Sequence, residues 1–328
     1  MRYDPVRFGA GALAWHLSDN AVARTRLEES AAVFRALGDR RGLAYALTQW
    51  GAAAERQSDL AAAGVAQEES VALFREVGDR WGLALATGFL AEIPYFQRDY
   101  TAAHALLDEA VMLFRAEGDC WGLGRALALL GFVVYDQGDA AAACRLFEES
   151  VPLLRVEGDK FTLAVALNKQ GNVLRSLGDY EQAAACYEAS IALFRELGNR
   201  GRIGSPLHNL GFVALHRGDD TRAAAYFVES LKFAHVQGDE GEIAACLVGL
   251  AGVAGTCGQF ERATRLFGAV DVLLAASGDD LDPANRVARD CSTAAVRAQL
   301  DEAAWATAWA AGRVLTLEQA IAEALAPS

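Results

Sequence analysis

Residues 171–200 read GNVLRSLGDYEQAAACYEASIALFRELGNR, and this stretch decides the fold. It holds two alanine-rich segments that favour helix, separated by Gly178-Asp179 and followed by Gly198-Asn199. A glycine readily takes the left-handed backbone conformation that ends a helix, and the side chain of the next residue can cap the helix that follows. The stretch therefore predicts a helix, a tight turn, a second helix and a second turn.

The same turn signal recurs along the chain with a period of about 40 residues, which is typical of repeat architectures. Gly-Asp or Gly-Asn pairs begin at Gly38, Gly78, Gly118, Gly158, Gly198 and Gly238. A second series lies midway, beginning at Ser18, Ser58, Arg98, Gly138, Gly178, Gly218 and Gly258. Between two signals, Val71, Phe74 and Val77 recur at helical spacing, while Glu68 and Glu69 fall on another face. The sequence therefore predicts an all-α array of helix pairs.

The periodic part is expected to cover residues 1–277, which hold seven helix-pair repeats of about 40 residues each. The first repeat begins abruptly at Met1, where a helix should already be under way. We interpret this start as a sign of excision from a longer protein, although terminal repeats of such arrays are often atypical in any case.

Residues 278–328 break the period and are expected to form a C-terminal helical cap. Asp282-Pro283 can start a helix, because proline is tolerated in a first turn. Trp305 and Trp309 have the i, i+4 spacing that puts both indoles on one face of a short helix. Thr316 precedes the last expected helix with the spacing of a capping box.

Composition argues for a cytoplasmic protein that touches neither nucleic acid nor membrane. The 30 Lys and Arg residues face 43 Asp and Glu, for a net charge of −13, and they form no basic run. Nucleic-acid binding needs clustered cations that displace counterions from phosphates. No apolar stretch is long enough to span a bilayer, and the N-terminus lacks a signal-peptide core. The six cysteines show no CxxC pair and are expected to be reduced.

Motifs of the common catalytic sites are missing from the sequence. It has no phosphate-binding GxxxxGK[ST] loop, no HExxH and no GxSxG. His208 and His216 are eight residues apart, and no third ligand is placed to complete a metal site with them. We therefore expect no enzyme, no cofactor and no metal.

Two features of the helices have simple structural interpretations. One repeat position holds a basic residue in Arg35, Arg75, Arg115, Arg155 and Arg195. An acidic residue precedes each by seven positions, in Glu28, Glu68, Asp108, Glu148 and Glu188. We favour cations that oppose the helix dipole on a solvated face over a phosphate-binding ladder. Prolines are expected to kink or break helices at Pro94, at Pro152 and in Gly204-Ser205-Pro206.

Within one unit, the residue types at fixed positions are more specific than the period. They are Gln170, Gly171, Leu174, Gly178, Tyr180, Ala183, Tyr187 and Ile191, and the next unit repeats them in Leu210, Gly211, Gly218, Ala223, Phe227 and Leu231. This spacing is similar to the tetratricopeptide repeat. The small residues let helices approach closely, and the aromatics fill the gaps between neighbours. The resemblance implies a right-handed superhelical solenoid of antiparallel helix pairs.

The repeat of this chain departs from the usual tetratricopeptide repeat in two ways, which point to a particular variety of it. The period is longer than the usual one of about 34 residues, and no proline closes the unit. The pattern resembles the long-repeat, MalT-like sensor regions of LuxR-family and AfsR-like bacterial regulators. The run from LFGAVDVLL to IAEAL, about the last 60 residues, resembles the C-terminal end of such regions. In that family ATP binding and DNA binding belong to other domains.

The resemblance implies a binding function rather than catalysis. The chain would be the sensing or partner-docking region of a bacterial transcriptional or signalling regulator. The ligand would be a protein or peptide segment, or a small effector, and binding would bias homo-oligomerisation or release inhibition. The alternative is a stand-alone scaffold or adaptor that bridges two protein partners.

In tetratricopeptide arrays the first helix of each pair lines the concave surface. On this chain the resemblance gives a mixed aromatic and polar groove, which we predict to include Arg125, Tyr135, Asn168, Asn172, Arg175, His208 and Phe212. Aromatic side chains supply contact area, while Asn and Arg supply directed hydrogen bonds. Asn168 and Asn172 fall where some members hold a peptide carboxylate, although the usual set of lysines is missing. Two Asn side chains on a wet helix face remain the alternative.

Overall fold

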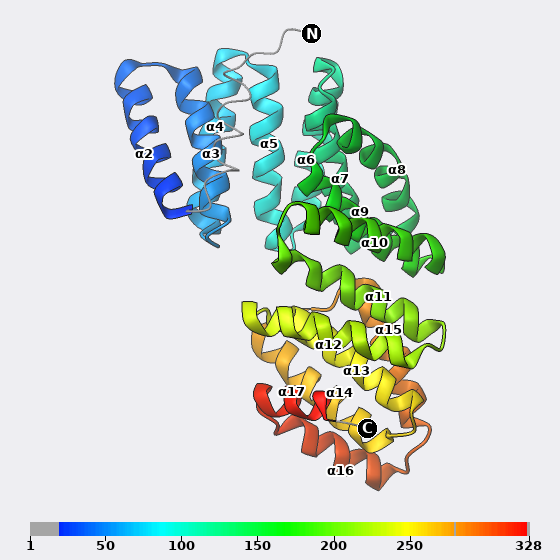
Figure 1. Cartoon of the computed structure of the whole chain (residues 1–328). Coiled ribbons are helices and arrows are strands. Elements are labelled where there is room, and N and C mark those ends of the chain that lie inside the picture. The colour runs from blue at the N-terminus through cyan, green and yellow to red at the C-terminus, as the bar shows by residue number, and fades with distance from the viewer. Residues whose placement is uncertain (1–19, 279, 327–328) are drawn as a thin grey trace. The chain divides into compact units, whose positions relative to one another are not determined.

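The computed structural model describes residues 20–278 and 280–326 of the chain. These residues form α-helices and one short 3-10 helix, with no strand among them. Figure 1 shows the helices succeeding one another as antiparallel neighbours. The first helix of the expected first repeat falls in residues 1–19 and lies outside the described residues. The predicted all-α fold class is confirmed for the described part of the chain.

Each repeat pairs a first helix with a second helix. The first helices are α3 (Arg40–Glu55), α5 (Arg80–Phe96), α7 (Cys120–Asp136), α9 (Lys160–Ser176), α11 (Gly204–His216) and α13 (Glu240–Thr256). The second helices are α2 (Asn20–Leu37), α4 (Leu60–Val77), α6 (Tyr100–Glu117), α8 (Ala140–Glu157), α10 (Tyr180–Glu196), α12 (Asp220–Gln237) and α14 (Phe260–Ser277). The chain then continues through α15 (Pro283–Arg297), α16 (Glu302–Arg313) and α17 (Leu317–Leu325).

The chain divides into two compact units, both built from these pairs. The first unit holds the described residues up to Gln137 together with residues 145–158 of the chain. The second unit holds residues 138–144 and the chain from Asp159 onward. The tail belongs to the second unit, because α15 packs on α9, α13 and α14, α16 packs on α14, and α17 packs on α13 and α14.

The turn residues act as their chemistry predicts. Gly78 ends α4 with a φ of +71°, and the Asp79 carboxylate then accepts a hydrogen bond from the Gly82 amide at 2.9 Å to cap α5. Ser58 and Arg98 take the same left-handed conformation without being glycine, with φ of 62° and 63°. The turn geometry is therefore imposed by the repeat even where the residue type resists it.

One turn departs from this pattern. Asn199 makes no side-chain cap, and the chain continues as the 3-10 helix η1 (Arg200–Ile203) before α11 begins at Gly204. The expected interruption near Gly204-Ser205-Pro206 is therefore present. In contrast, α5 and α8 continue past Pro94 and Pro152, so neither proline breaks its helix.

In three of the described pairs, α7–α8, α9–α10 and α11–α12, a glycine of the first helix faces an aromatic ring of the second. A Cβ placed at Gly211 would lie 2.6 Å from the ring of Phe227, and one at Gly131 would lie 2.9 Å from the ring of Phe147. Both rings are fully buried. Only glycine lets the helices come this close.

A buried serine fastens the two helices of a pair at the other end. Its hydroxyl donates to the backbone carbonyl 26 residues earlier, in the pairs Ser70–Ala44, Ser150–Gly124, Ser190–Ala164 and Ser230–Gly204, at 2.7 to 2.9 Å. Each hydroxyl is thus satisfied inside the repeat, as a buried polar group must be.

The recurrent arginines of the first unit lie on a solvated face, as expected, but they bond to the next pair. The ion pairs are Arg35–Glu69 at 2.6 Å, Arg75–Glu109 at 3.0 Å and Arg115–Glu149 at 2.7 Å. The series has no equivalent for Arg155, because Ala189 stands where the next glutamate would be. Exposed pairs of this kind contribute about 0–1 kcal/mol each.

The tail helices dock closely on α14. A Cβ at Gly268 would lie 2.6 Å from the Trp309 carbonyl, so α14 and α16 cross almost in backbone contact. Trp305 and Trp309 stack with centroids 5.3 Å apart, which confirms their predicted common face. The capping box that Thr316 was predicted to begin is also present, at the start of α17.

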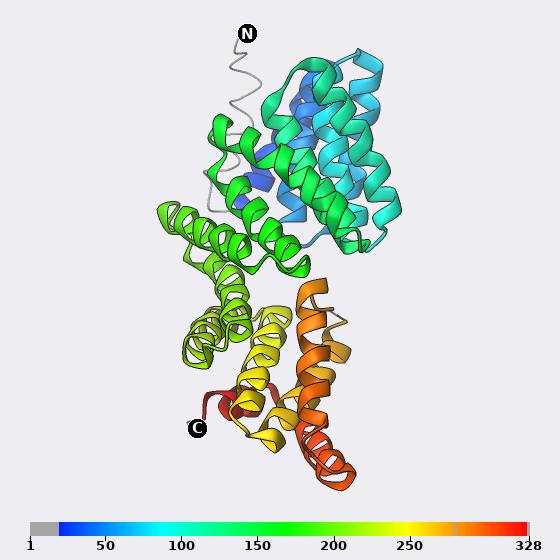
Figure 2. The same ribbon diagram turned by 90° about the vertical axis from the view of Figure 1, so that its right-hand side faces the viewer.

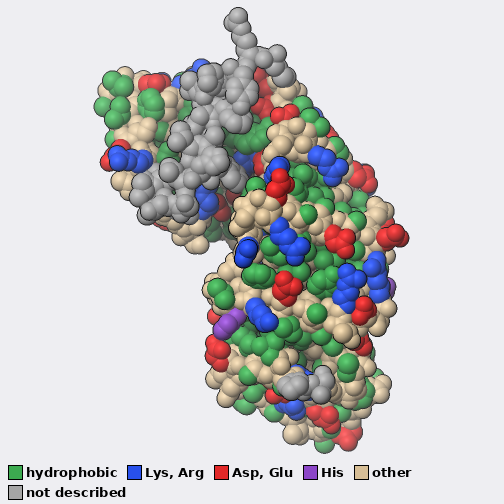
Figure 3. Space-filling view, in the orientation of Figure 1, with side chains coloured by type: hydrophobic (Ala, Val, Ile, Leu, Met, Phe, Trp, Pro, Cys, Tyr) green, Lys and Arg blue, Asp and Glu red, His purple; other side chains and the backbone are tan. Residues whose placement is uncertain are grey.

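No helix within the described residues is both long and apolar enough to cross a lipid bilayer. On the face drawn in Figure 3, basic and acidic side chains are interspersed rather than gathered into patches of one sign.

The close helix approach makes a direct prediction about stability. Gly211→Ala should destabilise the chain by about 1–3 kcal/mol, because the new methyl group meets a fully buried ring. Gly64→Ala is the control: its Cβ would meet only Ile93, at an ordinary 3.8 Å, and alanine favours helix by up to about 1 kcal/mol. Guanidinium unfolding of both variants measures the difference. Equal effects of the two substitutions would contradict the packing argument.

Candidate functional site

The predicted site residues divide between the two units. Arg125 and Tyr135 belong to α7 in the first unit, whereas Asn168, Asn172 and Arg175 in α9 and His208 and Phe212 in α11 belong to the second. All of them lie on first helices. We call the surface formed by the first helices of a unit its first-helix surface.

In the first unit, Arg125 is held between aromatic rings. Its guanidinium lies 5.0 Å from the ring centroid of Phe89 and 4.9 Å from that of Trp121. Such cation–π contacts hold the charge of Arg125 over the faces of the two rings. Tyr135 is only 2% exposed, so in this structure its ring contributes to the core.

A half-buried carboxyl group, that of Glu92, lies near this arginine. Burial and then the charge of Glu55 raise the pKa of Glu92, the charges of Arg125 and Arg56 lower it, and the net result is a pKa of about 7. Close by, the Tyr95 hydroxyl donates to the Asp136 carboxylate at 3.0 Å. The first-helix surface of this unit therefore combines a cation, an acid that titrates near neutrality and aromatic rings.

The raised pKa of Glu92 predicts a pH-dependent stability. Between pH 4.5, the ordinary pKa, and about 7, the folded chain holds a proton that the unfolded chain has lost. The unfolding free energy should therefore fall as pH rises through this window. Glu92→Gln should remove that fall and stabilise the chain at pH 8 by up to about 3 kcal/mol.

Urea unfolding at pH 5 and pH 8 measures this effect. Glu149→Gln is a suitable control, because it removes a glutamate from an exposed ion pair and should change stability by less than about 1 kcal/mol. A Glu92→Gln chain with the wild-type pH dependence would refute the assignment.

In the second unit, the predicted groove residues are covered by the chain itself. Asn172, Arg175 and His208 are 3%, 6% and 4% exposed. Their partners lie in the segment 282–285, at the start of α15. Figure 2 shows α15, in orange, alongside the yellow helices of this unit. The first-helix surface of the second unit thus already holds a polypeptide segment.

The carboxylate of this segment is recognised by two side chains of α9. Asp282 Oδ2 accepts from Asn172 Nδ2 at 2.9 Å and lies 3.3 Å from Lys169 Nζ. Although burial by itself raises the pKa of Asp282, the charges of Lys169 and Arg175 and the bond from Asn172 hold it below its usual range. This carboxylate, 14% exposed, is held in its charged form.

Arg175 recognises the next turn of the segment. It donates to the Asn285 side-chain oxygen through Nη2, and its Nη1 lies 3.5 Å from the Ala284 carbonyl. The guanidinium also lies over the ring of Phe212, 4.9 Å from its centroid. Phe212 thus acts as a platform for Arg175.

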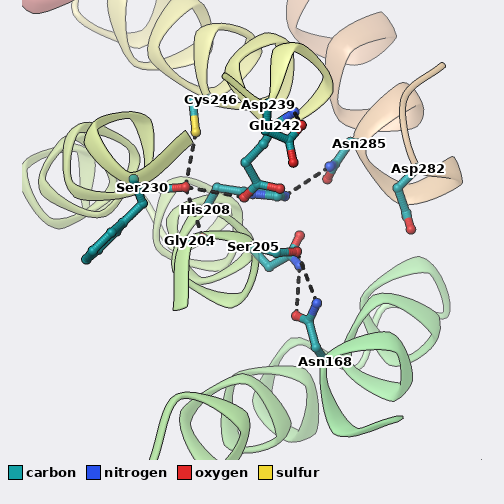
Figure 4. A network of polar contacts seen from close by, with 12 residues as sticks. Asn168, Gly204, Ser205, His208, Ser230, Asp239, Glu242, Cys246, Asp282 and Asn285 are labelled. Atoms are coloured by element: carbon teal, nitrogen blue, oxygen red, sulfur yellow. Dashed lines mark hydrogen bonds and ion pairs between the residues drawn. The ribbon is translucent and has the colours of Figure 1, made fainter. Parts of the chain in front are cut away.

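Asn285 connects Arg175 to His208, and Figure 4 shows its contact with the histidine. An arginine can only donate, so the amide oxygen of Asn285 faces it and the amide nitrogen faces His208 Nε2, at 3.2 Å. His208 Nε2 must then accept, which leaves the proton on Nδ1, where it is donated to Glu242 at 2.6 Å. The orientation of each group in this chain follows from its neighbour.

Asn168 lies beside this network and bonds to other residues. Its amide nitrogen donates to Ser205 Oγ at 3.1 Å, and its oxygen accepts from Asn209 at 3.1 Å. Asn168 therefore links α9 to α11. The pairing of Asn168 with Asn172 as a carboxylate clamp is not formed, because of these two only Asn172 bonds to Asp282.

Sequence reasoning missed Lys169, Asn209 and Glu242 in this site. Lys169 and Asn209 are direct sequence neighbours of predicted residues, so a wider window along each first helix finds them. The segment 282–285, which covers these residues, carries no comparable signal in the sequence. Asp282-Pro283 is typical of a helix start, and nothing in it indicates a contact with residues about 110 positions earlier. Within the described residues no group of three His, Cys, Asp or Glu side chains is placed to hold a metal ion.

Comparison with known proteins agrees with this architecture. The tetratricopeptide repeat family model matches residues 123–196, and the model described as anaphase-promoting complex subunit 5 matches residues 1–57. The chain has a tetratricopeptide-like solenoid fold. No curated protein sequence matches it.

Several solved structures are similar to this one in fold. A Rap protein complexed with the competence and sporulation factor is 17% identical, with a TM-score of 0.59 over 86% of this chain and 76% of that one. RapI in its apo form is 16% identical, with a TM-score of 0.54 over 77% and 97%. BtubC from P. vanneervenii is 15% identical, with a TM-score of 0.55 over 68% and 93%. At these identities the likeness establishes the fold.

Proposed function

We propose that this chain is a binding module that recognises a segment of a protein or peptide through its first-helix surfaces and catalyses no reaction. The observation that supports this most strongly lies in the second unit. There the first-helix surface holds the segment 282–285 by a carboxylate, a backbone carbonyl and a side-chain amide. The contacts with the carboxylate and the amide are of the kind by which a groove distinguishes one peptide sequence from another, and the backbone contact adds affinity.

The similar solved structures support a peptide as the ligand class. The Rap protein above is complexed with the competence and sporulation factor, and the Rap conjugation gene regulator of plasmid pLS20 is in complex with the Phr* peptide. The second is 12% identical to this chain, with a TM-score of 0.52. Proteins of this fold thus bind such ligands, and the surface described above has suitable chemistry.

The polar cluster of the second unit is better suited to binding than to catalysis. Ser230 donates to the Gly204 carbonyl at 2.9 Å, as the equivalent serines of other pairs do. His208 is engaged at both ring nitrogens. A nucleophile and a general base need mutual contact and access to a substrate, and these groups are buried and bonded elsewhere.

In its cellular role we propose the sensing or docking region of a cytoplasmic bacterial transcriptional or signalling regulator. The long repeat period and the regulator-like tail support this context. The alternative is an adaptor that bridges two proteins. The division into two units favours it, since each unit presents a first-helix surface of its own.

Capture from an extract of the source cell tests the proposal. The intact chain should retain a protein, peptide or small effector that at least one of the variants Asn172→Ala/Arg175→Ala and Arg125→Ala retains less, by about tenfold for a lost charged contact. Arg115→Ala is the matched control, because it removes an arginine from the exposed ion-pair series.

The pattern of losses separates the two roles. One ligand, lost through the changes in one unit only, supports a sensing site in that unit, whereas two ligands, each lost through one unit, support the adaptor. Equal retention by every variant would place binding outside the first-helix surfaces and refute the proposal.

A further inference from the structure

We propose that the segment Leu281–Arg297 is an internal ligand of the second unit, and that the external ligand displaces its first turn. By this inference, the external ligand is a protein segment that starts a helix with Asp and carries Asn three residues later. The inference deepens the proposed function and rests on it. We call the side chains that hold the first turn, namely Lys169, Asn172, Arg175 and His208, the acceptor surface.

The first turn of the internal ligand meets the acceptor surface through a chain of polar groups, whereas between repeats polar links such as Asn168–Asn209 accompany an apolar core. Repeats pack through alanine, glycine and aromatic rings, and their buried serines bond within the pair. The first turn of α15 is held instead by a buried polar network. Release of this turn would expose groups that a second polar segment can satisfy, and would leave the apolar core of the pairs in place.

The two ends of α15 are held differently. At its start the polar network acts beside the buried side chains of Leu281 and Ala284, which are 4% and 5% exposed. Its last turn is anchored by Val296, which is buried against α13 so closely that a Cβ at Gly255 would lie 2.7 Å from it. Its outer face is open to solvent, with Val287 62% exposed. The polar first turn can therefore leave the acceptor surface while the apolar end stays docked.

The acceptor surface demands a carboxylate at a helix start. Lys169 and Arg175 are the cations that face Asp282, and the nearby acid Glu242 is already engaged by His208. Asp282 also caps α15, since its other oxygen accepts from the Ala284 amide at 3.1 Å. The same carboxylate thus begins the helix and binds the surface, and a ligand needs both properties.

The side chain at position 285 has to serve as both a hydrogen-bond acceptor and a donor, as the amide of Asn285 does. The group there must accept from Arg175 and donate to His208 Nε2. A carboxylate offers no donor, and an apolar side chain offers neither. The fit is nevertheless incomplete, because Arg175 Nε is buried without a hydrogen-bond partner among the described residues. A ligand that supplies one more acceptor would bind more tightly than the internal segment does.

A peptide titration tests this inference. The probe is a fluorescein-labelled peptide of residues 280–298 with Ser in place of Cys291, and its control carries Asp282→Ala and Asn285→Ala. Three full-length proteins are compared: wild type, the Asp282→Ala/Asn285→Ala variant, and that variant with Asn172→Ala and Arg175→Ala added. The first double variant has an intact acceptor surface and a weakened internal ligand.

Fluorescence anisotropy should show the probe binding the Asp282→Ala/Asn285→Ala protein at least tenfold more tightly than wild type, because the tethered internal ligand competes in wild type. The control peptide and the quadruple variant should each lose at least tenfold. Circular dichroism of each protein confirms that it is folded.

Two results would overturn the inference. The first is equal binding of probe and control peptide, or no binding, by a folded Asp282→Ala/Asn285→Ala protein. The second is dimerisation of the wild-type chain that disappears in this variant, which would make the occupant a second copy. If the inference fails while capture from extract still depends on the first-helix surfaces, the proposed function stands alone. If the probe binds but capture from extract is the same for every variant, the acceptor surface recognises its own segment and the proposed binding of an external ligand fails.

Discussion

The absence of a side chain at one position of the first helix is the constraint on which the rest of the structure depends. At Gly131 and Gly211 a ring from the second helix fills the space that a Cβ would occupy, and in these pairs the helices can pack this closely only because the position is glycine. The equivalent position of α5 and of α13 holds the next smallest residue, as Ala91 and Ala251. The stacking aligns first helices side by side. In the second unit this alignment brings side chains of two successive first helices onto one surface, namely Lys169, Asn172 and Arg175 of α9 and His208 of α11.

The fold was predictable because its determinants are local and repeated. Each turn signal lies within a few residues of the helix that it ends or caps. The same signal recurs about every 40 residues, so each repeat supports the assignment of the others. The exceptions are local too. Asn199 makes no cap where Asp does so elsewhere, and the next helix opens as a 3-10 turn. The partners of the recurrent arginines were harder to predict, because Glu69 and Glu109 lie on the next second helix and a same-helix acidic residue offers an equally plausible partner.

The site was only partly predictable. The helical face of Asn172, Arg175 and His208 followed from the repeat phase, and all three take part in one network. Their occupant did not follow, since a contact between α9 and a segment about 110 residues later leaves no periodic trace. Tyr135 shows a second limit of prediction from sequence. Its position in the repeat places it on a first helix, but only the structure shows that its ring is buried in the core. The second unit therefore combines a predictable surface with an unpredictable ligand.

Hydrogen exchange of the intact chain tests the central claim, that this ligand can leave while the repeats remain folded. The amides at the start of α15 should exchange through a local opening that leaves α11 and α13 folded. The protection factors of these α15 amides should therefore be at least tenfold lower than those of the α13 amides. Asp282→Ala/Asn285→Ala should accelerate exchange at the start of α15 and leave α13 unchanged. Exchange of α15 and α13 at one common rate, in both proteins, would show that α15 is a fixed part of the core and would contradict the account.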